Sequence, residues 1–308
     1  MRFSIEAWAP EYGMSMETNG KSASETSVDI SVEAPPARWA PVTPPATTGA
    51  IDTVLFTDGV RRVDARLWIE SPGGAARPAM CASFAAGAIR CDGRAEIVAV
   101  DVQRGLFCAP NKDAEAVTTR HGCYPVRNAP GDSPEDLALG LQQHMGALEV
   151  GLASAESADL VLIDGPLSGR HAVPGAVGYV KTHHVAYLPP AVEGVVGDLA
   201  AGQRTPLFMT SSSWSRFSWY LRLPGPSGHP WAGVVRCESS ADAEVGRAVA
   251  LADAVAVTLP RFASAPHKDS RAPQNLYPIA GLERELRRRL GDPALLYRGL
   301  RRAALSPP

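Results

Sequence analysis

The sequence predicts a mixed α/β fold, in which one large sheet of parallel and antiparallel strands is flanked by helices. Strand-like segments are expected over residues 51–102, and the one over 60–69 alternates apolar and polar side chains, which is the pattern of a half-buried strand. A helix-like stretch over 136–155 follows, and short apolar runs then end at Asp164 and Val180. Strands first, with helices and strands alternating afterwards, are typical of a mixed sheet.

Residues 1–50 are predicted to form a flexible or extended arm outside this domain. They are rich in Ser, Thr, Glu and Pro, with five prolines between positions 35 and 45. Such a composition offers few apolar side chains to bury, so it supports little secondary structure of its own. We therefore expect one folded domain over residues 51–308.

The composition is that of an ordinary globular protein, with 45% hydrophobic and 20% charged residues. The formal net charge is −2, so any contact with nucleic acid must depend on local positive charge. The five cysteines include no C-x-x-C pair, which argues against a disulfide framework and a structural zinc site. No secretory signal and no run of about 18 to 20 apolar residues is visible, so we expect a cytoplasmic protein without membrane contact.

The first strands are expected on either side of an Asp-Gly turn. An apolar run ends at Asp58-Gly59, and Val60–Ile69 then alternates apolar and polar side chains. Because Asp-Gly is a frequent hairpin dipeptide, we predict a β-hairpin at this point. A second pair of strands is predicted over 80–89 and 95–102.

The middle of the chain contains the clearest helix signal, over Asp136–Ala155. Ser133 can cap its amino end, and Pro134 suits the first helical position. Leucine and methionine side chains recur at steps of three and four, which places them on one face. A buried strand that ends at Asp164 comes next, and another strand ends just before Lys181.

The last third of the chain predicts two more strands, over 217–223 and 231–238, and a helix over 241–251. The tail over 281–305 is predicted to be one helix that carries seven arginines. These segments complete the expected mixed sheet.

Two apolar runs end in the same dipeptide, one at Asp58-Gly59 and the other at Asp164-Gly165. Strand-end aspartates can converge in space, and their hard oxygen atoms suit a divalent cation. The alternative is that each dipeptide is only a turn, which is the stronger reading for Asp58 alone. Asp164, however, ends a fully apolar strand at a sheet edge, where ligands commonly bind. The pair therefore predicts a metal-dependent phosphodiester hydrolase.

Two further charged side chains are candidates for the same site. Glu149 borders the apolar face of the predicted helix and could be another ligand, or a boundary carboxylate with its head in water. Lys181 could contact a phosphate oxygen, or be an ordinary surface lysine. His183 and His184 are neighbours on an extended segment and point to opposite sides, so we do not expect both to bind one metal.

Missing motifs argue against several enzyme classes. The sequence has no G-x-S-x-G elbow, which makes a serine hydrolase a poor fit. It also has no G-x-x-x-x-G-K-[ST] and no G-x-G-x-x-G, so nucleoside triphosphate and dinucleotide binding have no support.

The order of these features resembles the NurA family of DNA-repair nucleases. The resemblance is carried by the strand that ends at Asp58, the helix with Glu149, the strand that ends at Asp164 and the strand before Lys181. The later segments SWYLRLP, GVVRCE and RAPQNLYPIAGLERELRRRLGD are similar as well. The resemblance extends over residues 53–300. Because each motif is short, the resemblance depends on the order and spacing of the motifs.

The resemblance implies an RNase H-like fold with extra β-hairpins and an active site that needs Mn²⁺ or Mg²⁺. It implies a 5′–3′ exonuclease and single-strand endonuclease of DNA end resection, which hydrolyses phosphodiesters with two metals roughly 3.5 to 4 Å apart. Asp58 and Asp164 would be metal ligands, and Glu149 would be a third ligand or orient one. Lys181 would contact the scissile phosphate. The implied partners are DNA, a second copy of the chain and a HerA-type hexameric ATPase.

The carboxyl-terminal part departs from the family pattern. Archaeal members place a histidine near the Tyr-Pro segment, whereas no histidine follows His267 in this sequence. The last metal ligand is therefore open, with Asp253 and Glu283 as candidate replacements. Asn275 and Tyr277 are expected to position the substrate instead.

Local positive charge would hold the DNA, with Arg61, Arg62, Lys181 and the arginines of the last helix as candidates. The alternatives for that helix are a solvated face with arginines paired to nearby acids, or a docking site for a partner protein. The missing histidine supports a second reading, a catalytically silent partner or scaffold for a HerA-type ATPase on the same fold. A third reading is an unrelated metallohydrolase of small phosphoesters, which would not need the arginine-rich helix.

Overall fold

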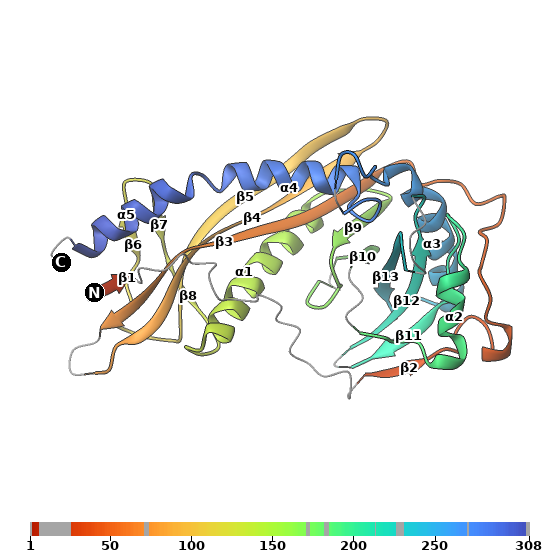
Figure 1. Ribbon diagram of the computed structural model, residues 1–308, viewed down its shortest axis with the longest axis horizontal. Coiled ribbons are helices and arrows are strands. Elements are labelled where there is room, and N and C mark those ends of the chain that lie inside the picture. The colour runs from red at the N-terminus through yellow and green to blue at the C-terminus, as the bar shows by residue number, and fades with distance from the viewer. Residues whose placement is uncertain are drawn as a thin grey trace.

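The computed structural model describes residues 2–5, 26–70, 74–170, 173–181, 185–212, 214–225, 231–269 and 271–305. In this part of the chain, a large mixed sheet is flanked by helices, which confirms the predicted α/β class (Figure 1). None of the described helices has the length and the apolar composition that crossing a bilayer requires.

The helices and strands follow one another along the described residues with these bounds. They are β1 (Arg2–Ile5), β2 (Ser27–Asp29), the 3-10 helix η2 (Pro36–Arg38), β3 (Val54–Glu70), β4 (Arg77–Cys91), β5 (Ala95–Cys108), β6 (Val117–Thr119), β7 (Gly122–Tyr124), β8 (Val126–Asn128), α1 (Pro134–Ala155), β9 (Leu160–Asp164), β10 (Ala176–Val180), α2 (Pro190–Asp198), β11 (Phe208–Ser211), β12 (Ser215–Arg222), β13 (Val234–Ser240), α3 (Val245–Thr258), the 3-10 helix η3 (Leu259–Phe262), α4 (Tyr277–Arg289) and α5 (Pro293–Leu305).

The strand order in the sheet is β2-β11-β12-β13-β10-β9-β3-β4-β5-β8, and β1 pairs with the far end of β3. The pairs β3–β9, β9–β10 and β5–β8 are parallel, while the remaining pairs are antiparallel. The strands β6 and β7 form a separate hairpin. Three long strands, β3 to β5, run along the molecule, and they carry α4 and α5 on one side and α1 on the other (Figure 1).

The hairpin predicted at Asp58-Gly59 is wrong, because β3 runs through this dipeptide as one strand of 17 residues. Asp58 lies opposite Gly87 and Gly59 opposite Ala86 in the ladder with β4. Gly59 is also not among the glycines with a left-handed backbone, which the expected turn would need. Long-range pairing with β4 and β9 therefore outweighs the local turn preference of Asp-Gly.

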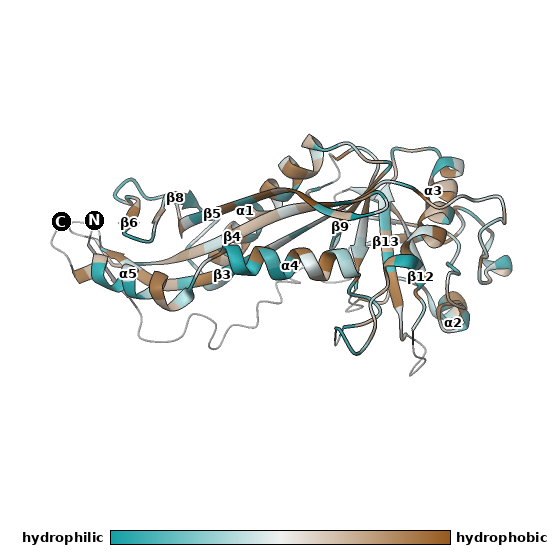
Figure 2. Cartoon of the chain, turned by 90° about the horizontal axis from the view of Figure 1, so that it is seen from above, coloured by the Kyte–Doolittle hydropathy of each residue, from teal (hydrophilic) through white to brown (hydrophobic). Residues whose placement is uncertain are grey.

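Alternate residues of β3 face opposite helices. Phe56 and Val60 belong to the same buried cluster as Leu282 and Leu286 of α4. Val63 instead packs with the leucine and methionine face of α1. In Figure 2 the long strands are largely hydrophobic, and α4 shows hydrophilic and hydrophobic patches side by side, as expected for a helix with one buried face. The sheet thus separates an α4 face from an α1 face.

Ser133 caps α1 as predicted, since its side chain accepts a hydrogen bond from the backbone N–H of Asp136. Two helices differ from their predicted bounds. α3 begins at Val245 and continues to Thr258. The tail is two helices rather than one, because Gly291 adopts a φ of 84° between α4 and α5.

The arm predicted over residues 1–50 lies partly outside the described residues. In its described part, β2 pairs with β11 at the edge of the sheet. Glu33 follows β2 and accepts hydrogen bonds from the buried guanidinium of Arg204. This stretch of the chain is therefore attached to the sheet by backbone pairing and by an ion pair.

Candidate active site

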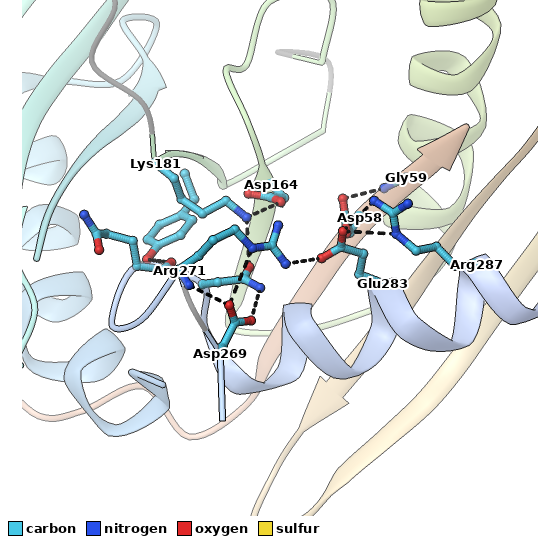
Figure 3. Close-up of polar contacts among 11 residues, drawn as sticks. Asp58, Gly59, Asp164, Lys181, Asp269, Arg271, Glu283 and Arg287 are labelled. Carbon is cyan, nitrogen blue, oxygen red and sulfur yellow. Dashed lines mark hydrogen bonds and ion pairs between the residues drawn. The ribbon is translucent and has the colours of Figure 1, made fainter. Parts of the chain in front are cut away.

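Two neighbouring strands bring the predicted aspartates side by side. β3 and β9 are parallel, and the last pair of their ladder is Thr57 with Ile163. The next residues are Asp58 and Asp164. β9 ends at Asp164, whereas β3 continues beyond Asp58. The two carboxylates therefore lie at the carboxyl end of β9 (Figure 3).

Both aspartates carry negative charge in a poorly hydrated place. Asp58 is 9% exposed, and its burial, together with the charge of Asp164, raises its pKa well above the ordinary value. Burial also raises the pKa of Asp164, although the nearby Lys181 opposes this. Among the described residues, Oδ1 of Asp164 is buried and has no hydrogen-bond partner. The two adjacent carboxyl groups therefore share one cation in direct contact among the described residues, Lys181.

Lys181 reaches Asp164 from the adjacent parallel strand. Tyr179 of β10 lies opposite Asp164, and Lys181 follows the end of β10. The Nζ atom of Lys181 lies 2.6 Å from Oδ2 of Asp164 and donates to Oδ1 of Asn275 at 3.0 Å. Asn275 in turn donates to Asp269 at 2.6 Å. The structure thus places the predicted residues Lys181 and Asn275 directly beside the aspartates.

Glu283 is the third carboxylate on this face. It lies on α4, and its charge helps to raise the pKa of Asp164 (Figure 3). Arg271 lies 2.7 Å from one of its oxygens and Arg287 lies 2.9 Å from the other. Of the two residues named as replacements for the missing histidine, Glu283 is therefore the one at the site.

Glu149 approaches the same strands from the α1 face. It is 2% exposed and forms an ion pair with the buried Arg170. Burial raises the pKa of Glu149, and Arg170 opposes that effect. A Cβ atom on Gly59 would overlap the Glu149 carboxylate, so only glycine at this position lets Glu149 reach the backbone of β3. Asp58 and Glu149 thus face opposite sides of one strand.

Arg61 and Tyr277, the other predicted substrate contacts, lie at the margins. Arg61 donates to Gln142 of α1, and burial lowers its pKa while the charge of Glu149 opposes this. Tyr277 begins α4 and is 39% exposed, with the ammonium group of Lys268 5.1 Å from its ring centre. Neither residue forms a described hydrogen bond with the aspartates.

Two other candidates lie elsewhere or outside the described residues. Asp253, the second proposed replacement ligand, lies on α3 and pairs with the buried Arg204 at 2.7 Å. His183 and His184 lie outside the described residues. The site therefore contains four carboxylate residues. Asp58, Asp164 and Glu283 lie on one face of the sheet, and Glu149 lies on the other.

The described residues contain no group of three or more His, Cys, Asp or Glu side chains spaced to hold a metal ion. A smaller donor set remains, because Asp58 is buried, Asp164 beside it is partly buried, and both have raised pKa values. Mg²⁺ commonly binds through one or two carboxylates and keeps several water molecules, which substrate phosphates then replace. The two aspartates fit that type of site, and the unpartnered Oδ1 of Asp164 provides a free donor atom.

Sequence reasoning missed three residues that shape the site. Arg170 follows Asp164 in the connection to β10, and Arg271 and Asp269 lie in the segment before α4. No local pattern distinguishes these residues from ordinary loop residues. The one usable signal was Gly59, since an isolated glycine inside a strand often marks a close approach by another group.

A scan against models of known protein families gives no match to this chain, and a search of the curated proteins gives none either.

Proposed function

We propose that this chain is a metal-dependent phosphodiester hydrolase that cleaves DNA on an RNase H-like sheet. The observation that carries the proposal is the pair Asp58 and Asp164, which lie side by side on adjacent parallel strands and have raised pKa values. Two adjacent carboxyl groups with raised pKa values favour the binding of a further cation, because Lys181 contacts only Asp164 among the two. Lys181, on the third parallel strand, supports a substrate that is itself an anion.

In this proposal Asp58 and Asp164 hold Mn²⁺ or Mg²⁺, which would activate water and stabilise the oxygens that attack and leave phosphorus. Lys181 would turn from Asp164 to a phosphate oxygen, and Asn275 would hold its ammonium group in place. Glu283 and Glu149 would orient the aspartates or water from the two faces of β3. Arg271 would keep Glu283 directed at the site.

DNA as the substrate follows from the resemblance to NurA nucleases. The same resemblance is the only support for a 5′–3′ exonuclease and single-strand endonuclease in end resection, for a homodimer and for a HerA-type ATPase as a partner. The α/β architecture and the parallel order β3-β9-β10 at the site are compatible with this assignment.

One observation favours a second candidate, a silent scaffold for a HerA-type ATPase. The described residues lack a metal-binding group of three side chains, and Lys181 already pairs with Asp164. A scaffold would bind the partner without any metal-dependent cleavage.

A nuclease assay separates these two candidates. End-labelled single- and double-stranded DNA would be incubated with Mn²⁺, Mg²⁺ or EDTA and with wild type, Asp58→Asn or Asp164→Asn. We expect cleavage that needs the metal and falls by about 10³-fold in either variant. Glu285→Gln is the control, because Glu285 lies on α4 two residues from Glu283 but pairs with Arg288 and Arg289 instead.

Cleavage that survives both aspartate substitutions would place the active site elsewhere. Absence of cleavage in wild type, together with binding to an ATPase partner, would favour the scaffold.

A further inference from the structure

A groove lies between α5 and the turn that joins β6 to β7, at the opposite end of the long strands from β9 (Figure 1). Its volume is about 510 Å³. Gly299 allows the helix to approach the turn, because a Cβ atom at this position would lie only 3.2 Å from Cδ2 of His121. We call this feature the α5 groove.

The α5 groove is lined by basic side chains, and none of its described lining residues is acidic. Arg120 and Arg298 are exposed on its two sides, and His121 and Arg302 adjoin them. α5 itself contains no Asp or Glu, whereas arginines of α4 pair with Glu283 and Glu285 of their own helix. The alternative of arginines paired to acids of their own helix therefore holds for α4, whereas α5 has no acidic residue of its own.

We propose that the α5 groove binds the phosphate backbone of a DNA duplex whose other part lies at the carboxylates. The inference rests on the hydrolase function proposed above. Arginine side chains are common phosphate contacts, and a concave surface of one charge raises the local concentration of a polyanion. Sites for single strands use aromatic side chains for stacking, but none of the described lining residues is Phe, Tyr or Trp, and His121 is the one aromatic ring among them. The backbone of a duplex is therefore the feature that the groove fits.

The distance between the α5 groove and the carboxylates determines how long a DNA duplex must be to contact both sites. Glu283 and Arg298 are 15 positions apart on α4 and α5, which lie end to end along the molecule (Figure 1). At about 1.5 Å per helical residue this is roughly 22 Å, or about seven base pairs at ~3.4 Å each. A single small phosphodiester can reach the carboxylates without touching the groove, whereas a duplex of about 20 base pairs reaches both.

The test compares two variants with the same change in charge. The groove variant carries Arg120→Glu and Arg298→Glu, and the control carries Arg38→Glu and Arg94→Glu, two exposed arginines outside the groove. Fluorescence anisotropy with a labelled duplex of about 30 base pairs, in EDTA, gives Kd as a function of salt. We expect the groove variant to bind at least about tenfold more weakly and its salt slope to fall by about two, with the control close to wild type.

Kinetics with Mn²⁺ completes the test. The KM of the groove variant for the long duplex should rise, while its rate on bis(p-nitrophenyl) phosphate stays unchanged. Unchanged duplex affinity in the groove variant, or an equal loss in the control, would overturn the inference even if Asp164-dependent cleavage is found. A loss of affinity confined to the groove variant would uphold groove binding even if no version cleaves DNA, in which case only the hydrolase proposal fails.

Discussion

Two carboxylate sites lie on nearby strands of one sheet. One is Glu238, the other is the pair Asp58 and Asp164, and their surroundings shift the carboxyl pKa values in opposite directions. Glu238 of β13 is fully buried, and it accepts hydrogen bonds from Arg216, Arg236 and the backbone N–H of Leu167. Burial alone would raise the pKa of Glu238, but Arg236 and Arg216 hold it below the ordinary value. Asp58 is also buried and Asp164 is partly buried, yet their pKa values are raised.

The difference distinguishes a carboxylate whose charge the protein balances from two carboxylates that are candidates for a functional role. The protein supplies two cations for the single charge of Glu238, so this group is complete without a ligand. Around Asp58 and Asp164, Lys181 is the cation in direct contact, while Arg271 and Arg287 pair with the neighbouring Glu283. Two adjacent carboxyl groups with raised pKa values and one directly contacting cation are candidates for binding a further cation.

The largest expected effect comes from removing a cation at Glu238. Arg236→Met would leave a buried carboxylate with Arg216 as its remaining cation, so we expect the free energy of unfolding to fall by about 3 to 5 kcal/mol. Urea denaturation at neutral pH measures this. Arg94→Met, at a side chain 79% exposed, is the matched control and should change stability by less than about 0.5 kcal/mol.

At the candidate active site, we expect a substitution to raise the free energy of unfolding instead of lowering it. Asp58→Asn removes a charge that burial and Asp164 both disfavour, so the metal-free protein should gain about 1 to 2 kcal/mol. Urea denaturation in EDTA measures the gain. A loss of stability equal to that of Glu238→Gln would show that the two groups do not differ.

Glu283 and Glu285 allow the comparison to be made within one helix. Glu283→Gln should lower kcat/KM for DNA by about tenfold, because Glu283 is near Asp164 while Glu285 pairs only with arginines of α4. Glu285→Gln should leave kcat/KM within about twofold of wild type. Equal effects of the two substitutions on DNA cleavage would remove Glu283 from the site.

The smallest effect is a pH dependence of opposite sign at the two groups. The folded pKa of Asp58 lies above its unfolded value of about 3.9, so its contribution is greatest below that pH and is lost as pH rises through the folded pKa. The folded pKa of Glu238 lies below its unfolded value of about 4.3, so its contribution is present above that pH and is lost on acidification.

Unfolding measured in EDTA from about pH 2.5 to about pH 7 tests this pair of signs, because the Glu238 contribution is lost below the unfolded pKa of about 4.3. The advantage of Asp58→Asn over wild type should grow as pH rises, by a few tenths of a kcal/mol per pH unit. The disadvantage of Glu238→Gln should shrink as pH falls. Parallel curves for the two variants would contradict the comparison.

Local signals predicted much of the fold and the two central residues of the site. Ser133 and Pro134 marked the start of α1, and the ends of two apolar runs marked Asp58 and Asp164. The prediction of a turn at Asp58 was wrong, because pairing with β4 keeps the strand extended. A local sequence pattern around Asp58 does not reveal this pairing. Arg170 could not be predicted from the sequence, because it meets Glu149 only after α1 packs on the sheet.

The most direct test of the central claim is the binding of Mn²⁺ itself. Isothermal titration of MnCl₂ into wild type, Asp164→Asn and Glu238→Gln, each at neutral pH, compares the two carboxylate groups by one readout. We predict saturable binding in wild type, its loss in Asp164→Asn and its retention in Glu238→Gln. Wild type that binds no Mn²⁺, or Asp164→Asn that binds it as wild type does, would contradict the account.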